Sequence, residues 1–135
     1  MKIFVYGSLR RGMHNDIHRF FERTEAEAEY LGTTVVKGKM YSLGAFPYIT
    51  EPFPYDRQGE VVLGEVYEIK SSRVKLLKAL DRLEGYPSFY NRKMVSTALG
   101  EVWVYFIPNR TEVSPQVPNG DWVSYVNRTG ATNES

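Results

Sequence analysis

Residues 1–15 read MKIFVYGSLRRGMHN, and they contain the strand around which the predicted fold is built. The pattern predicts a strand over residues 2–6, and from residue 3 onward every side chain in it is apolar or aromatic. Because both faces of such a strand are apolar, it belongs at the centre of a buried sheet. The strand runs directly into Gly7-Ser8-Leu9, which predicts a tight turn at its carboxyl end.

That turn is the first candidate binding site. The carboxyl end of a strand is a favoured position for a ligand, and glycine there lets backbone N–H groups approach a carboxylate or carbonyl oxygen. The N–H groups of Gly7, Ser8 and Leu9 would form an anion-binding cup. An ordinary strand-to-loop turn has the same residues and is the more common case for so short a motif.

The composition predicts one globular domain. The chain has 135 residues, of which 42% are hydrophobic and 14% aromatic, which is enough for one sizeable core and too few for two ordinary domains. We expect this domain to span residues 1–127 and the polar residues 128–135 to form a frayed tail. The oligomeric state is left open by the sequence, and a monomer is compatible with it.

Charge and cysteine content exclude several classes of function. Lysine and arginine number 17 against 16 acidic residues, so no basic field would attract nucleic acid or anionic lipid. The absence of cysteine excludes disulfides, thiolate catalysis and cysteine-based metal sites. No stretch approaches the roughly 20 apolar residues of a membrane span, and no apolar core of a signal peptide is present. We therefore expect a cytoplasmic protein with no membrane or nucleic-acid partner.

Hydrophobic periodicity predicts the remaining elements. In chain order they are a short helix starting at Asn15-Asp16, a β-rich stretch over 30–43, a loop over 45–60, a strand over 61–69, a helix over 73–84, a hairpin over 90–97 and 101–107, and a docked turn at 120–122. We expect Ser71-Ser72 to cap the longer helix, and Gly85 to end it. The apolar face of this helix is predicted to hold Val74, Leu77, Leu80 and Leu83, and Leu76 widens it. This order predicts an α+β fold with a mixed sheet.

Glu84 is the candidate acid/base. It lies at the end of the longer helix, from which it can turn into an aromatic pocket made by Tyr86, Phe89 and Tyr90. A carboxyl group placed there would be desolvated and its pKa would rise, which suits general acid/base catalysis. A solvated glutamate at a helix terminus is the alternative. The neighbouring Asp81 and Arg82 are interpreted as a surface ion pair.

No metal site is predicted. His14 and His18 are four residues apart, a spacing that places two imidazoles on one helix face, but no third ligand accompanies them. Surface histidines are the better interpretation, and no Ser-His-Asp triad can be assigned.

Several motifs occur together in one order. The sequence contains Tyr6-Gly7-Ser8-Leu9 followed by a basic-Gly-x-x-Asn stretch, then Gly64-Glu65-Val66-Tyr67, then a helix ending Leu80-Asp81-Arg82-Leu83-Glu84-Gly85-Tyr86-Pro87, and finally Tyr90-Asn91-Arg92. This set resembles the γ-glutamylcyclotransferase-like family over residues 3–107, and Gly120-Asp121-Trp122 is similar to the closing motif of its small microbial members.

The resemblance implies a fold, a reaction and a site. The implied fold is a small β-barrel with flanking helices, and the reaction is the intramolecular cyclisation of a γ-glutamyl amide to 5-oxoproline with release of an amine or amino acid. The family's catalytic glutamate corresponds to Glu84. Its substrate-binding positions correspond to Tyr6, Gly7, Ser8, Leu9, Tyr90 and Arg92. No metal or cofactor is implied, because one carboxylate can move the protons of an intramolecular reaction.

A second interpretation stays open beside the enzyme. The same turn could serve a non-catalytic protein that binds a small acidic or amine-bearing metabolite, and likeness of fold does not separate the two. The presence of Glu84 favours the enzyme, because a binding protein gains little from a carboxylate beside the ligand's own carboxylate.

Overall fold

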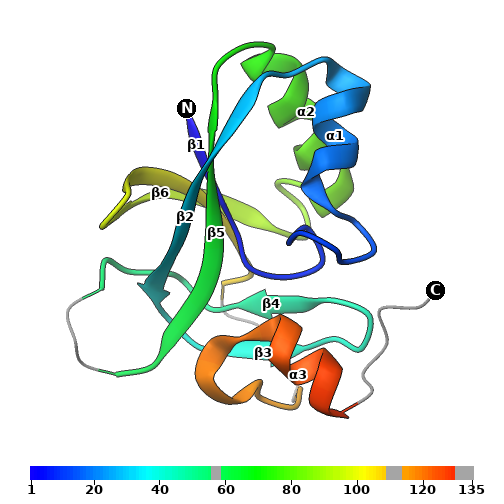
Figure 1. Cartoon of the computed structure of the whole chain (residues 1–135). Helices are drawn as coiled ribbons and strands as arrows, with labels where there is room; N and C mark the ends of the chain where they lie inside the picture. Colours follow the sequence, from blue (N-terminus) through cyan, green and yellow to red (C-terminus); the bar gives the residue numbers. More distant parts are fainter. Residues whose placement is uncertain (56–58, 109–113, 130–135) are drawn as a thin grey trace.

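The structure is a computed structural model, and it describes residues 1–55, 59–108 and 114–129. Figure 1 shows two helices above a twisted sheet and a third helix below it. The elements are β1 (Lys2–Val5), α1 (Ile17–Thr24), β2 (Ala28–Lys37), β3 (Met40–Ser42), β4 (Pro47–Ile49), β5 (Val61–Ile69), α2 (Arg73–Glu84), β6 (Asn91–Thr97), β7 (Gly100–Phe106), the short 3₁₀ helix η1 (Pro118–Gly120) and α3 (Trp122–Thr129).

Strand β1 lies at the centre of the main sheet, as its two apolar faces predict. The five strands are arranged in the order β2-β5-β1-β7-β6. β1 pairs antiparallel with β5, where Val5 stands opposite Glu65, and parallel with β7, where Ile3 stands opposite Trp103. The turn after β1 therefore leaves from the middle of the sheet.

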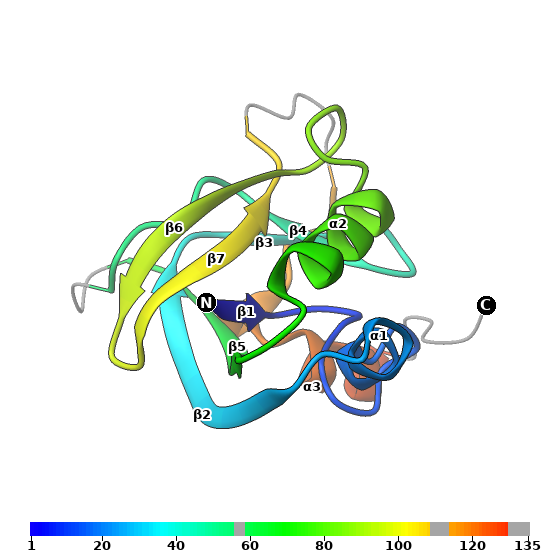
Figure 2. The same ribbon diagram turned by 90° about the horizontal axis from the view of Figure 1, so that it is seen from above.

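The two faces of β1 serve two halves of the core. Ile3 and Val5 belong to a buried cluster that includes side chains of α1 and α2. Phe4 points to the opposite side, into a cluster that includes Trp122 of α3 and Met40 of β3. The helices α1 and α2 thus cover one face, and α3 with the β3–β4 hairpin covers the other, as Figures 1 and 2 show from two directions.

Several predicted local features are confirmed. The Asp16 side chain accepts a hydrogen bond from the N–H of His18 and so begins α1, while Gly85 ends α2 with a left-handed φ of 67°. Gly64 lies where a Cβ atom would stand 2.5 Å from Phe4 Cζ and 2.6 Å from the Val5 carbonyl oxygen, so β5 can approach β1 this closely only with glycine. β6 and β7 form the expected hairpin.

α2 begins directly after Ser72 as predicted, but the predicted side-chain cap is wrong, and only part of the predicted apolar face is buried. Ser72 has a left-handed φ of 54° and makes no side-chain cap; its hydroxyl instead donates to the Glu25 carbonyl oxygen at 3.5 Å. The buried stripe of the helix consists of Leu76 and Leu80, whereas Val74 is 67% exposed. Burial of Leu76 and Leu80 is therefore confirmed and burial of Val74 is wrong, while the last apolar residue, Leu83, lies at the wall of a cavity.

Two elements were not expected. The predicted loop over residues 45–60 contains β4, in which Pro47 occupies the first position, where a missing N–H is tolerated; residues 56–58 of that loop lie outside the described residues. The predicted turn at 120–122 is η1 followed by α3, which runs to Thr129, two residues beyond the expected end of the domain. Residues 130–135 of the predicted tail lie outside the described residues.

The α+β class and the mixed sheet are confirmed, but a closed barrel is not seen. Within the described strands, β2 and β6 are the two edges of the main sheet and do not pair with each other. Of the helices that the structure describes, none is long and apolar enough to cross a membrane.

Candidate active site

A small cavity opens between the turn after β1 and the end of α2. Its volume is about 140 Å³, well above the roughly 10–15 Å³ that one water molecule needs. The residues that line it come from both predicted site segments and from three further elements: Phe4, Val5, Tyr6, Gly7, Ser8, Leu9, Asn15, Phe46, Pro47, Leu83, Glu84, Phe89, Tyr90 and Tyr105. The structure thus brings Tyr6, Gly7, Ser8, Leu9, Glu84 and Tyr90 together in one cavity.

The turn is held by its carbonyl groups, which leaves its N–H groups unused. The carbonyl oxygens of Gly7, Ser8 and Leu9 accept hydrogen bonds from the N–H groups of Arg10, Asn15 and Ile17 at 3.0, 3.0 and 2.9 Å. Among the described residues, no acceptor is paired with the N–H groups of Gly7, Ser8 or Leu9. Three adjacent N–H groups without an acceptor are suited to an oxyanion or a carboxylate.

Gly7 is required by the wall of the cavity. A Cβ atom at this position would lie 2.5 Å from Cγ of Pro47, which is far inside contact distance. The absence of a side chain therefore allows the turn to lie directly against Pro47, itself a cavity residue.

Glu84 is the last residue of α2, and its side chain lines the cavity. Desolvation by burial raises the pKa of this carboxyl group from 4.5 to about 7. In the described part of the chain no group hydrogen-bonds to the carboxyl, so nothing offsets the loss of water. A carboxyl group with a pKa near neutrality can both accept and return a proton.

The aromatic walls of the cavity are themselves fixed by hydrogen bonds. The Tyr6 hydroxyl donates to the Tyr105 carbonyl oxygen at 2.8 Å, and the Tyr90 hydroxyl donates to the Pro47 carbonyl oxygen at 2.7 Å. Burial, with smaller contributions from Tyr90 and Glu84, raises the pKa of Tyr6 well above its usual value, so its hydroxyl stays neutral. These rings form a rigid apolar wall around Glu84.

Arg92, expected to contact substrate, lies outside the cavity lining. Its Nε and Nη2 donate to the two carboxylate oxygens of Asp81 at 2.9 and 3.1 Å, and its guanidinium lies over the rings of Tyr86 and Trp103 at 4.4 and 4.6 Å. The hydrogen bond to Asp81 raises the pKa of Arg92. Asp81 is consequently paired with Arg92 and not, as predicted, with Arg82.

Two cavity residues carry roles that sequence reasoning did not assign. Nδ2 of Asn15 donates to Ser8 Oγ at 3.2 Å and so supports the turn. The sequence feature that indicates this role is the position of the asparagine shortly after the basic-Gly stretch. Tyr105 lines the cavity, while its neighbours Val104 and Phe106 face the opposite core. The alternation over residues 101–107 predicts that side chains at alternate positions lie on opposite faces of the strand, but it does not identify the face that lines a cavity.

The histidines lie away from this cavity. Nδ1 of His18 lies 2.6 Å from Oδ1 of Asp16, next to the start of α1. In residues 1–55, 59–108 and 114–129, no group of three or more histidine, cysteine, aspartate or glutamate side chains is placed to hold a metal ion.

Comparison with known proteins gives a family match over nearly the whole chain. The model of the family "Gamma-glutamyl cyclotransferase, AIG2-like" matches residues 3–124. A protein of Methanocaldococcus jannaschii, described as "Putative gamma-glutamylcyclotransferase", is 35% identical over 130 residues, covering 91% of this chain and 96% of its own. The "Gamma-glutamylcyclotransferase family protein YtfP" of Escherichia coli K12 is 30% identical over 124 residues, with the same two coverages of 91% and 96%.

Solved structures show the same fold. An uncharacterized protein of Pyrococcus horikoshii has a TM-score of 0.70 at 20% identity, covering 96% of each chain, and supports the fold alone. The solution structure of Escherichia coli YtfP has a TM-score of 0.62 at 30% identity and covers 91% of this chain and 96% of its own.

Proposed function

Because the chain belongs to the gamma-glutamyl cyclotransferase, AIG2-like family, we propose that it cyclises a γ-glutamyl amide to 5-oxoproline and releases an amine or amino acid. The observation that carries this proposal is the cavity itself. It is lined by Glu84, whose carboxyl group has a pKa of about 7, and by the turn residues Gly7, Ser8 and Leu9, whose N–H groups have no acceptor among the described residues. Each of the two parts has a separate task in the reaction.

Glu84 moves the protons. In its carboxylate form it takes a proton from the substrate's α-ammonium, which frees the nitrogen lone pair to attack the γ-carbonyl carbon. A carbon–nitrogen bond forms, the ring closes, and the bond to the leaving nitrogen breaks. The proton held by Glu84 passes to the leaving nitrogen as its bond breaks, which restores the carboxylate. The ring nitrogen then loses its second proton to Glu84, and this proton passes to the released amine. The products are 5-oxoproline with a neutral lactam nitrogen and an ammonium ion, so atoms and charge balance.

The turn after β1 binds charge. The N–H groups of Gly7, Ser8 and Leu9 donate hydrogen bonds to the substrate carboxylate or to the oxygen that becomes negative as the γ-carbonyl is attacked. Tyr6 and Tyr90 form the walls against which the glutamyl chain folds back on itself. The attacking and leaving nitrogens belong to one molecule, so the reaction as proposed uses no metal ion or cofactor.

The test is Glu84→Gln. Glutamine keeps the shape of the side chain but cannot accept the ammonium proton, so kcat should fall roughly 100- to 10,000-fold, the range typical of a lost general acid/base, while substrate binding persists. Release of 5-oxoproline would be measured with a panel of γ-glutamyl amines, γ-glutamyl dipeptides and glutathione. Glu22→Gln, which makes the same chemical change at an exposed position of α1, is the control.

Two results would contradict the proposal. A Glu84→Gln protein with kcat within a few-fold of wild type would show that another group moves the protons. A wild-type protein that binds 5-oxoproline but converts no member of the panel would support the non-catalytic binding protein instead.

A further inference from the structure

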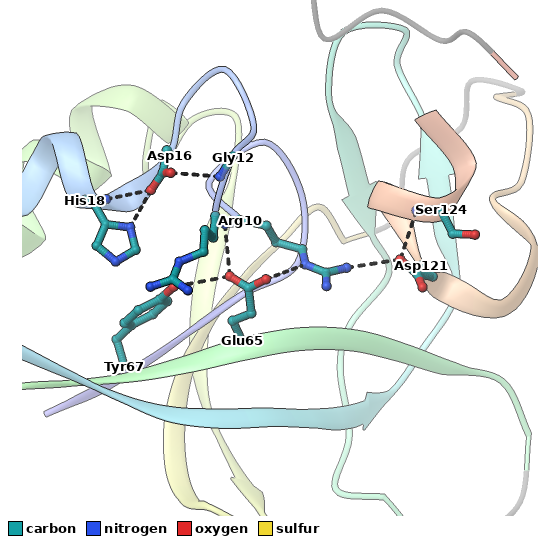
Figure 3. A network of polar contacts seen from close by, with 9 residues as sticks. Arg10, Gly12, Asp16, His18, Glu65, Tyr67, Asp121 and Ser124 are labelled. Carbon is teal, nitrogen blue, oxygen red and sulfur yellow. Dashed lines mark hydrogen bonds and ion pairs between the residues drawn. The ribbon is translucent and has the colours of Figure 1, made fainter. Parts of the chain in front are cut away.

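A buried ion pair lies beneath the turn that follows β1. Nε of Arg10 donates to Oε2 of Glu65 at 3.1 Å, and the two side chains are only 10% and 11% exposed. Figure 3 shows both side chains between β5 and the turn. Removing two charges from water is unfavourable unless further hydrogen bonds satisfy them. The other hydrogen bonds of Arg10 and Glu65 therefore indicate what the ion pair does in the structure.

Glu65 holds both ends of the turn. Its backbone stands opposite Val5, the last residue of β1, in the sheet. Its side-chain Oε1 accepts the N–H of Arg11 at 3.0 Å and the hydroxyl of Tyr67 at 3.3 Å. Residues 6–9 therefore leave the sheet beside Glu65 and return to the carboxylate of the same residue.

Arg10 extends the network to the C-terminal helix. Its Nη1 donates to Oδ1 of Asp121 at 3.1 Å, and the same oxygen accepts the N–H of Ser124 in the first turn of α3 at 3.2 Å (Figure 3). The turn is thus tied to β5 and to α3, two elements that are distant from it in sequence.

None of these three charged residues lines the cavity, so any effect on a ligand passes through the turn. We propose that Arg10 and Glu65 are positioning residues, whose ion pair holds the turn in the conformation that leaves the N–H groups of Gly7, Ser8 and Leu9 available to a ligand. For the chemical identity of that ligand, the inference rests on the proposed function.

Glu65→Gln is the decisive variant. The carboxylate accepts from Arg10 on one oxygen and from Arg11 and Tyr67 on the other. The amide has one oxygen and no charge, and its NH2 group faces the donor or donors of the other position, so the turn should loosen. We expect kcat/KM to fall at least about tenfold, mainly through KM, and the Kd of 5-oxoproline measured by calorimetry to rise by a similar factor. The pKa in the pH profile of kcat should remain that of Glu84, because the substitution leaves Glu84 in place. A purely structural role of Glu65 is distinguished by the Kd, because a variant that is only less stable binds 5-oxoproline with unchanged affinity in its folded fraction.

Glu68→Gln is the matched control, since Glu68 lies on the same strand, outside this network and outside the cavity. Its kcat/KM should stay within about twofold of wild type, as expected for a surface change away from the site. A folded Glu65→Gln protein that equals this control in kcat/KM and in 5-oxoproline affinity would overturn the inference.

Hydrogen exchange tests the inference without any activity. The N–H groups of Arg10, Asn15 and Ile17 close the turn onto its own carbonyls, and they should exchange at least about tenfold faster in Glu65→Gln, while the amides of the β6–β7 hairpin are unchanged. Should the wild type convert no γ-glutamyl compound, the proposed function fails, but this measurement still decides the positioning role.

A milder variant covers the case in which Glu65→Gln does not fold. Asp121→Asn keeps the Arg10–Glu65 pair and changes a side chain that is 30% exposed. It should fold, and it should accelerate exchange at the same three amides to a smaller extent. Unchanged exchange at all three would contradict the inference.

Discussion

At the scale of single residues, Glu84 combines a catalytic advantage with a cost in stability. Burial, with no hydrogen-bonding partner in the part of the chain that the structure describes, holds its pKa at about 7 instead of 4.5. Below pH 4.5 the carboxyl is protonated in both the folded and the unfolded chain, so it does not alter stability. As the pH rises from 4.5 to 7, the unfolded chain releases the proton while the folded chain keeps it. The free energy of unfolding therefore falls across this window and is lower by about 3 kcal/mol above it.

Glu84→Gln removes this titration. The variant should match wild type in unfolding free energy at pH 4 and exceed it by up to about 3 kcal/mol at pH 8. Urea denaturation at both pH values, with Glu22→Gln as the control, checks the expectation. A stability difference that does not change with pH would show that the carboxyl titrates normally. Activity should follow the opposite trend, because kcat/KM rises as the carboxylate form appears around pH 7.

Glu84 could be predicted from sequence because its surroundings are local: the end of a helix, a glycine and nearby aromatic rings. The contacts of Glu65 could not, although a buried charged residue between apolar neighbours in a strand is a notable feature. Its partners Arg10 and Arg11 are 55 and 54 residues away, and only the pairing of β1 with β5 brings them together.

At the scale of elements, the last turn of α2 is held by Asp81, three residues before Glu84. The Tyr105 hydroxyl donates to Oδ1 of Asp81 at 2.6 Å, and Arg92 binds both carboxylate oxygens. This turn of the helix is therefore attached to β6 and β7, and the position of Glu84 depends on that attachment.

Asp81→Asn should lower the free energy of unfolding by about 1–3 kcal/mol, because it leaves the largely buried Arg92 with one neutral acceptor in place of a carboxylate. Thermal and urea denaturation would measure the loss. Arg82→Gln, at the neighbouring exposed position, should change stability by no more than about 0.5 kcal/mol. Equal effects of the two substitutions would contradict the assigned pairing.

The elements that sequence predicts well are those with local signals. β1 has two apolar faces, α1 has a capping aspartate, and the β6–β7 hairpin has a two-residue connection. α3 was missed because Val123, Tyr125 and Val126 are poor helix formers, and burial of Trp122 in a core built by distant strands overrides that preference. β4 was missed because it has three residues, begins with proline and depends on pairing with β3.

At the scale of the whole molecule, the charge of the cavity limits the substrate. Within residues 1–55, 59–108 and 114–129, no lysine, arginine or histidine lines it, and Glu84 is the one carboxyl group in its lining. Leu83 and Phe89, which are 41% and 44% exposed, add apolar surface to its lining. A carboxylate on the leaving group would lose its hydration there without gaining an ion pair with a cation of the lining, which is energetically unfavourable.

We therefore expect γ-glutamylethylamide to be a better substrate than γ-glutamylalanine, which differs from it by the carboxylate on the leaving group. The ratio of kcat/KM values should be at least about tenfold, which corresponds to about 1.4 kcal/mol. Release of 5-oxoproline from each compound measures the ratio. A preference for γ-glutamylalanine would mean that a cation outside the cavity lining reaches the leaving group.

The central position of β1 has a consequence for how the chain is made. This apolar strand is synthesised before both of its partners, β5 and β7, which end at Ile69 and Phe106. At about 5–20 residues per second, the ribosome needs roughly 5–20 s to complete the second partner. Throughout that interval β1 is an unpaired hydrophobic segment on a nascent chain, and sheet formation must wait for contacts that are distant in sequence. The strand that leads into the proposed binding turn is thus also the segment for which a chaperone would have the longest opportunity to bind.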